Sequence, residues 1–154
     1  MPEACVNIGD FRCYPLADGD FLYPKGALFP NRSDEELAPV LGPNDLSTDL
    51  RVGYSSLLID TGRRRILIDT GAGPLAPSTG QLLESLNRSG FGPHEIDLVV
   101  LSHLHADHIG GLLTSNGELS FPNAEFLVSR LEHDFWMVRD KPGEIRIGRV
   151  VRCR

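Results

Sequence analysis

Two nearly identical apolar segments constrain the fold more than any other feature of this sequence. Residues 56–62 read SLLIDTG and residues 65–71 read RILIDTG, with a short polar turn between them. Before the shared Asp-Thr-Gly, both segments are apolar without alternation, which is typical of strands covered on both faces of a sheet. We therefore expect a hairpin, with helices packed on its sheet.

Strand and helix patterns alternate along the rest of the chain. Strands are expected at Ile96–Leu101 and Ala124–Ser129, and the spacing of leucines predicts a helix at Gly80–Ser89. This alternation indicates an α/β fold, and 154 residues fit one domain, 1–154. The remaining expectations are one or two strands in Val6–Leu22 with a turn near Asp18-Gly19, a capped helix at Ser33–Leu41, a helix starting in HIGGLLTS, a helix in RLEHDFWMV with Leu131, Phe135 and Val138 on one face, and a final strand at Glu144–Val151.

Composition excludes several classes of partner. The formal net charge of −6 argues against a nucleic-acid or anionic-membrane surface, and Arg63–Arg65 is interpreted as a solvated turn. There is no apolar run of ~20 residues and no export signal at the N-terminus. Cys5, Cys13 and Cys153 are odd in number and form no CxxC pair, which favours reduced thiols. We therefore expect a cytoplasmic protein with no membrane partner.

The segment SHLHADHIGG, residues 102–111, carries the chemistry. His103 and His105 are two apart, so on extended chain they project to one side and can bind one cation. Asp107 and His108 follow where the chain turns and can address a second cation. Imidazole with carboxylate suits Zn²⁺ and similar ions, whereas Ca²⁺ and Mg²⁺ prefer oxygen ligands throughout. A single histidine after a strand is usually an ordinary loop residue, but three with an aspartate in six residues favour a metal site.

This segment resembles the H-x-H-x-D-H signature of the metallo-β-lactamase superfamily, and ILIDTG resembles the strand and turn that precede it there. The resemblance covers about Val6–Val138. The stretch LADGDFLYPKGALFP and the later VSRLEHDFW look more like the branch of lactonases and organophosphate hydrolases. The resemblance implies a four-layer αβ/βα sandwich with a two-metal site at one edge of its paired sheets.

Carried onto this sequence, the resemblance also implies residue roles. His103 and His105 would bind the first metal, and Asp107 and His108 the second, with a water held between the metals as the attacking hydroxide. Asp107 would also accept a proton during turnover, which makes it the catalytic residue. Asp69 matches the acid that orients the metal-binding loop in the family; the alternative is an ordinary turn residue.

The sequence departs from the family after this motif. The family completes its site with two more histidines and a bridging aspartate, but the only histidine after His108 is His133, interpreted as a surface or helix-packing residue. The acids Asp134, Asp140 and Glu144 lie in no recognisable family context. The chain therefore resembles a C-terminally truncated N-terminal portion of the sandwich, with apolar sheet surface left uncovered. A truncated gene, pairing as a homodimer, and a longer native chain are the three explanations.

Two functions remain open at this stage. The first is a metal-dependent hydrolase that cleaves a lactone, ester or phosphoester, with a small-molecule substrate and a divalent metal, most simply zinc. The second is an inactive remnant that folds and binds metal weakly or not at all. A hydrolase on a (β/α)₈ barrel shares the H-x-H pattern, but such barrels need ~250 residues. Substrate identity, the metal and the oligomeric state are left open.

Overall fold

The computed structural model describes residues 4–42, 49–137 and 151–152. In these residues seven strands form one sheet, ordered as they occur in the chain. The strands are β1 (Val6–Ile8), β2 (Phe11–Tyr23), β3 (Leu50–Asp60), β4 (Arg65–Ile68), β5 (Leu98–Leu101), β6 (Glu125–Val128) and β7 (Val151–Arg152). The first four strands pair antiparallel and the last four pair parallel, with β4 in both sets. The α/β expectation is confirmed.

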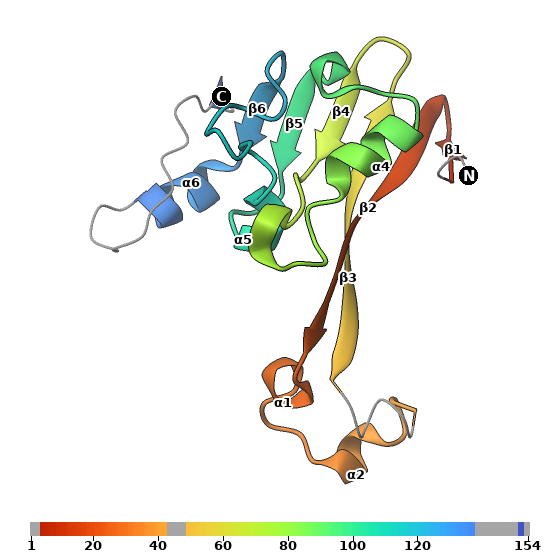
Figure 1. The fold of residues 1–154 in the computed structure, drawn as a ribbon, viewed down its shortest axis with the longest axis vertical. Helices are drawn as coiled ribbons and strands as arrows, with labels where there is room; N and C mark the ends of the chain where they lie inside the picture. Colours follow the sequence, from red (N-terminus) through yellow and green to blue (C-terminus); the bar gives the residue numbers. More distant parts are fainter. Residues whose placement is uncertain (1–3, 43–48, 138–150, 153–154) are drawn as a thin grey trace.

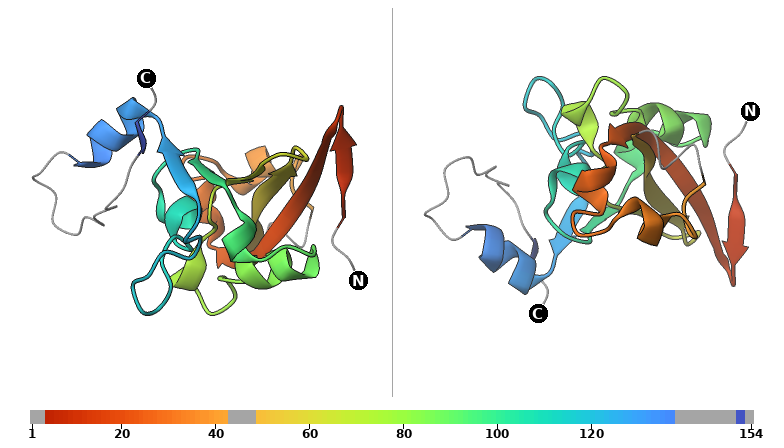
Figure 2. Two further views of the ribbon diagram at one scale, coloured as in Figure 1. Left: turned by 90° about the horizontal axis from the view of Figure 1, so that it is seen from above. Right: turned by 90° about the horizontal axis from the view of Figure 1, so that it is seen from below.

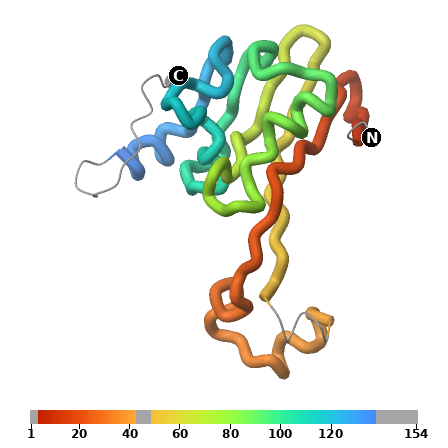
Figure 3. Tube along the Cα trace, viewed as in Figure 1, coloured from red at the N-terminus to blue at the C-terminus, as the bar shows by residue number. Residues whose placement is uncertain are grey.

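Short helices connect these strands. They are α1 (Lys25–Leu28), α2 (Asp34–Leu37), α4 (Leu82–Arg88), α5 (Ala106–Ile109) and α6 (Arg130–Met137), with the 3₁₀ helices η1 (Gly73–Leu75) and η2 (Pro93–Glu95). Figure 1 shows β2 and β3 leaving the body of the molecule as a long two-stranded arm that carries α1 and α2 at its end. The tube in Figure 3 follows the same path. None of the helices in the described part of the chain has the length and hydrophobicity that a membrane crossing requires.

The predicted hairpin is confirmed. Leu57 pairs with Ile68, and Asp60 pairs with Arg65, at the two ends of the β3–β4 ladder. The polar turn closes with the Thr61 N–H donating to the Arg64 carbonyl at 3.0 Å. The sheet continues from β4 to β5 in parallel, so the second LIDTG segment ends where β5 also ends.

Helix α4 and the segment around α5 cover one face of the sheet (Figure 2). The side chains of this face are excluded from solvent and include Leu16, Leu58, Leu67 and Val99, each 0% exposed. On the opposite face the apolar side chains are only half-buried among the described residues: Leu57, Ile59, Ile66, Ile68, Leu98, Val100 and Leu127. The expectation that the sheet is covered on both faces therefore fails for the described residues, which form two of the four expected layers. The half-buried face agrees with the expectation of a partial sandwich.

Several element predictions need correction. Residues 18–19 form no turn, because β2 runs through them with a bulge between Ala17 and Gly19, and the turn lies instead between β1 and β2. The helix expected to start in HIGGLLTS is also wrong, because α5 begins at Ala106 and already ends at Ile109. The helix predicted at Ser33–Leu41 is shorter, although its capping box is present.

The predicted helix near residue 131 is confirmed as α6, but its orientation differs. Leu131 is 85% exposed and Phe135 is 60% exposed, so the apolar pair predicted on one face points to solvent in the described structure. The polar face of α6 instead contacts the loop between β5 and α5, which carries His103 and His105. Val138 and residues 144–150 of the final predicted strand lie outside the described residues.

The buried carboxylate of Asp60 makes the stability of the hairpin depend on pH. The Gly62 N–H donates to Asp60 at 2.8 Å, and the Arg12 guanidinium also contacts it. These interactions, the backbone bond first, lower the pKa of Asp60 below its ordinary value. A folded-state pKa below the unfolded value stabilises the protein above pH ~4, and this contribution is lost as pH falls through the folded pKa.

We therefore expect Asp60→Asn to lower the free energy of unfolding at pH 7 and to weaken its fall between pH ~4 and ~2. Urea unfolding at a series of pH values measures this, with exposed Asp10→Asn as the matched control. An unfolding free energy of Asp60→Asn that follows the wild-type pH profile would contradict the assignment.

Candidate metal centre

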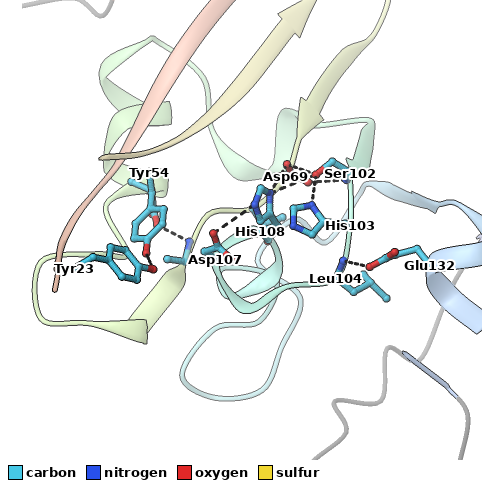
Figure 4. A network of polar contacts seen from close by, with 12 residues as sticks. Tyr23, Tyr54, Asp69, Ser102, His103, Leu104, Asp107, His108 and Glu132 are labelled. Atoms are coloured by element: carbon cyan, nitrogen blue, oxygen red, sulfur yellow. Dashed lines mark hydrogen bonds and ion pairs between the residues drawn. The ribbon is translucent and has the colours of Figure 1, made fainter. Parts of the chain in front are cut away.

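The cluster residues lie at the carboxyl end of β5. His103 follows the strand, His105 is the N-cap residue of α5, and Asp107 and His108 belong to α5. The His105 backbone is extended, which lets the chain turn from strand to helix directly at the histidines. Binding sites in open α/β sheets form at the carboxyl ends of the strands. The fold thus places all four predicted ligands at such an end, and Figure 4 shows three of them, His103, Asp107 and His108.

The three imidazole rings are close together. The ring centroids of His103 and His108 are 3.8 Å apart, and those of His103 and His105 are 4.7 Å apart. The His103, Asp107 and His108 side chains are partly buried, and His105 is exposed. The sequence-predicted residues are therefore brought together, with one side open to solvent.

Asp69 joins the end of β4 to this cluster. Its Oδ1 accepts the Ser102 N–H at 2.7 Å, and its Oδ2 accepts the Ser102 hydroxyl at 2.7 Å and lies 2.8 Å from His108 Nδ1. In the described part of the chain Asp69 is the one non-glycine residue with a positive φ, 61°. A left-handed aspartate is uncommon and is strained, so surrounding contacts must hold it there. These contacts match the orienting role that the sequence predicted for Asp69.

The orientation of His108 leaves its other nitrogen available. With Nδ1 bonded to Asp69, Nε2 points toward Asp107 and lies 3.5 Å from Asp107 Oδ2. Two ligands at 2.0–2.1 Å from a tetrahedral zinc are separated by about 3.4 Å. The spacing of this pair therefore fits two ligands of one ion, the pairing predicted for Asp107 and His108.

The donor set is incomplete for a full centre. Among the described residues, no group of three or more histidine, cysteine, aspartate or glutamate side chains has the arrangement to hold a metal ion. A catalytic zinc ordinarily has three protein ligands. The chemistry of the donors and the Asp107–His108 spacing fit a divalent metal, while the number of converging ligands is that of a weak site. His133 lies on α6, where its Nδ1 is 3.1 Å from Asp134 Oδ1.

Two glycines bring the backbone of α5 against the loop that follows Asp69. A Cβ on Gly110 would lie 2.1 Å from the Ala72 carbonyl oxygen, and a Cβ on Gly111 would lie 2.1 Å from the Thr70 carbonyl oxygen. The Thr70 N–H also donates to the His108 carbonyl at 2.8 Å. The absence of side chains at these two glycines is what allows the two backbone segments to approach so closely.

We expect Gly111→Ala to destabilise the protein by about 1–3 kcal/mol, because the added methyl would overlap a backbone oxygen that cannot rotate away. Gly53→Ala is the matched control, since a Cβ there meets nothing within 4 Å. Urea unfolding compares the two. Equal unfolding free energies for the two variants would contradict this prediction, because they would show that the loop moves away from the added methyl at no cost.

Asp18 supports the same loop and was missed by the sequence analysis, which interpreted it as a turn residue. It is 0% exposed. Its Oδ2 accepts the Ala72 N–H at 2.7 Å and its Oδ1 accepts the Leu82 N–H at 2.9 Å. The sequence ADGD is typical of a turn, so the residues around Asp18 do not indicate that its side chain is a buried hydrogen-bond acceptor.

Asp18→Ala would leave two buried N–H groups without an acceptor, and we expect a loss of about 2–4 kcal/mol in the free energy of unfolding. Asp20→Ala on the same strand removes only an exposed contact to Arg51 and should cost less than about 1 kcal/mol. Denaturant unfolding of both variants checks this. A loss for Asp18→Ala no larger than for Asp20→Ala would refute the role.

The arm contributes two tyrosines that the sequence analysis also missed. The Tyr23 and Tyr54 hydroxyls are hydrogen-bonded, and Figure 4 shows them on the Asp107 side of the cluster. Burial, then the bond to Tyr23, raises the pKa of Tyr54, and the charge of Asp107 acts in the same direction. Tyr54 therefore stays protonated, and one of the two hydroxyls donates to the other.

Comparison with known proteins identifies the family. The family model described as the metallo-beta-lactamase superfamily matches residues 50–142, which include β3, β4, β5 and the whole histidine segment. This chain belongs to the metallo-β-lactamase superfamily. The match confirms the resemblance carried by ILIDTG and SHLHADHIGG.

Named relatives and solved structures agree. The chain is 45% identical over 137 residues to metallo-beta-lactamase domain-containing protein 1 of Mus musculus, covering 84% of this chain and 48% of that protein. It is 39% identical over 106 residues to the lactamase-like protein adaB of Aspergillus niger, covering 65% of this chain and 32% of that protein. AidC, a dizinc quorum-quenching lactonase solved with a product, matches with a TM-score of 0.80 and 36% identity, covering 86% of this chain and 46% of that one.

The chain thus spans less than half the length of these relatives. The solved structure of the hydrolase AbOPH, in the beta lactamase superfamily, also matches this chain, with a TM-score of 0.69 and 25% identity. The match covers 89% of this chain and 47% of that one. The observed α/β sheet is accordingly part of a metallo-β-lactamase fold.

Proposed function

We propose that this chain carries the first half of the metal centre of a metal-dependent hydrolase, acting on a lactone, an ester or a phosphoester. The observation that carries the proposal is the pair formed by His108 Nε2 and Asp107 Oδ2, 3.5 Å apart, with the other imidazole nitrogen held by Asp69. A divalent ion bound there would polarise a carbonyl or phosphoryl oxygen and activate water.

The side chains of this centre have distinct roles in the proposal. His103 and His105 form one ligand pair, and Asp107 with His108 forms the other. Asp69 holds His108 with Nδ1 toward the protein, so that Nε2 faces the ion. Asp107, at the open side of the centre, accepts the proton released by the attacking water. The metal is proposed to be zinc, because the donors are imidazole and carboxylate and because the relative AidC is a dizinc enzyme.

A lactone is the favoured substrate within this class. The support is AidC, a lactonase that covers 86% of this chain at 36% identity. Within the described residues, the hydrogen-bonded hydroxyls of Tyr23 and Tyr54 lie on the Asp107 side of the cluster, and the one that does not donate within the pair could donate to a carbonyl or leaving oxygen. The remaining metal ligands and the walls of the substrate pocket would come from residues outside this sequence, either in a longer native protein or in a second copy of the chain.

Zinc binding tests the metal part of the proposal. We expect equilibrium dialysis followed by elemental analysis to detect zinc on the wild-type chain. The double variant Asp107→Ala, His108→Ala should bind it at least about 10-fold more weakly, because it loses both members of the spaced pair. His94→Ala, an exposed histidine in η2, is the matched control and should bind as the wild type. No zinc on the wild type, or equal affinity in the double variant, would overturn the proposal.

Turnover then separates the hydrolase from the inactive remnant. Hydrolysis of lactones and phosphoesters that disappears with a chelator and with His105→Ala would exclude the remnant for this chain. Zinc binding without turnover would favour the remnant, since the incomplete donor set described above predicts a weak site.

A further inference from the structure

Helix α6 contacts the loop between β5 and α5 through Glu132, which bonds to Leu104, and through Trp136, which lies against His105. The Ser129 hydroxyl accepts the Glu132 N–H at 3.2 Å at the start of the helix. Glu132 and Trp136 are four residues apart, so they lie on the same helix face. That face meets the loop between β5 and α5 (Figure 4).

One oxygen atom of Glu132 links the helix to the loop. Glu132 Oε1 accepts the Leu104 N–H at 2.9 Å and the Trp136 indole N–H at 2.7 Å. Leu104 lies between the two histidines of the H-x-H segment and is 5% exposed, so its N–H faces the carboxylate rather than water. These two hydrogen bonds, Leu104 first, lower the pKa of Glu132, which is therefore ionised at neutral pH.

Trp136 touches one of the predicted ligands directly. Its ring lies edge-on to His105, with the centroids 5.6 Å apart and the planes at 87°. The indole is itself fixed by its bond to Glu132, so the ring that limits the movement of His105 is held in place. His105 is exposed, and within the described part of the chain no hydrogen bond joins its ring to the rest of the cluster, in contrast to His108, which Asp69 holds.

We propose that Glu132 and Trp136 are positioning residues that fix the Leu104 backbone and the His105 ring, and so hold the first ligand pair, as Asp69 holds His108 in the second. This inference rests on the proposed function for its metal part. Removing an outer hydrogen-bond partner of a metal ligand typically costs 10–100-fold in metal affinity. The support is supplied by α6 (Arg130–Met137), which follows the motif and β6 in the chain.

The experiment compares wild type, Glu132→Ala and Glu132→Gln, with Glu118→Gln on an exposed turn as the matched control. Amide exchange of Leu104 is measured first, without metal. We expect at least about 10-fold faster exchange in Glu132→Ala, partial recovery in Glu132→Gln because its amide oxygen can still accept, and no change in the control. Thermal unfolding by circular dichroism verifies that each variant is folded.

Zinc is then titrated into the same proteins. Trp136 is the only tryptophan in the sequence, so its fluorescence reports binding next to His105, and competition with a chromophoric chelator gives the affinity independently. We expect the wild-type fluorescence to change on zinc binding, and the affinity to fall about 10–100-fold in Glu132→Ala and less in Glu132→Gln.

The outcomes separate this inference from the proposed function. Leu104 exchange in Glu132→Ala that stays at the wild-type rate overturns the inference, whatever zinc does. Unchanged zinc affinity in Glu132→Ala, with normal wild-type binding, also overturns it and leaves the proposed function standing. A wild type that binds no zinc overturns the proposed function and the metal part together, while faster Leu104 exchange in Glu132→Ala would still uphold the support of the loop.

Discussion

The carboxylate of Asp69 joins the segments from which the candidate centre is built. One oxygen holds the backbone of Ser102 at the end of β5, and the other holds the Ser102 hydroxyl and the His108 ring. A carboxylate can do this because it accepts at both oxygens at once. The left-handed backbone of Asp69 is the cost, and it is sustained by contacts from β5 and α5. Without this residue His108 would have no fixed orientation toward Asp107.

The segments around Asp69 pack closely against one another through their backbones. The loop after β4 packs backbone to backbone on the end of α5 at Gly110 and Gly111, and the buried carboxylate of Asp18 ties the same loop to β2 and α4. A rigid scaffold of this kind holds ligands in position before a metal arrives, which increases affinity by lowering the ordering cost. His105 is the exposed member of the cluster, so the cluster stays open to solvent on its side.

The two ligand pairs are held differently. The pair containing His108 is fixed from within the sheet by Asp69, while His105 depends on the helix α6 at the rim of the molecule. Residues at the rim have fewer buried neighbours and open more easily. The described sheet also presents a half-buried apolar face, and the relatives are about twice as long as this chain. Further structure against that face would stabilise the strands from which both pairs extend.

What the sequence by itself determined was local. The hairpin followed from two apolar runs and a polar turn, and the proximity of the four candidate ligands followed from H-x-H-x-D-H, since residues two to five apart need only one strand end and one turn to meet. The family followed from the same segments. Burial of the opposite sheet face was overestimated, because continuous apolar runs do not reveal whether the covering layer lies within the chain.

Only the tertiary structure decided which polar residues serve the centre. The sequence LIDTG occurs twice, yet its two aspartates have different roles. Asp60 closes the hairpin turn beside Arg12, while Asp69 orients His108. The reason is that β3 and β4 run in opposite directions, so their carboxyl ends lie at opposite ends of the hairpin. Asp18 accepts from residues 54 and 64 positions away, and Glu132 from Leu104 28 positions away. No spacing in the sequence encodes such pairs; they depend on strand order, register and the path of each loop.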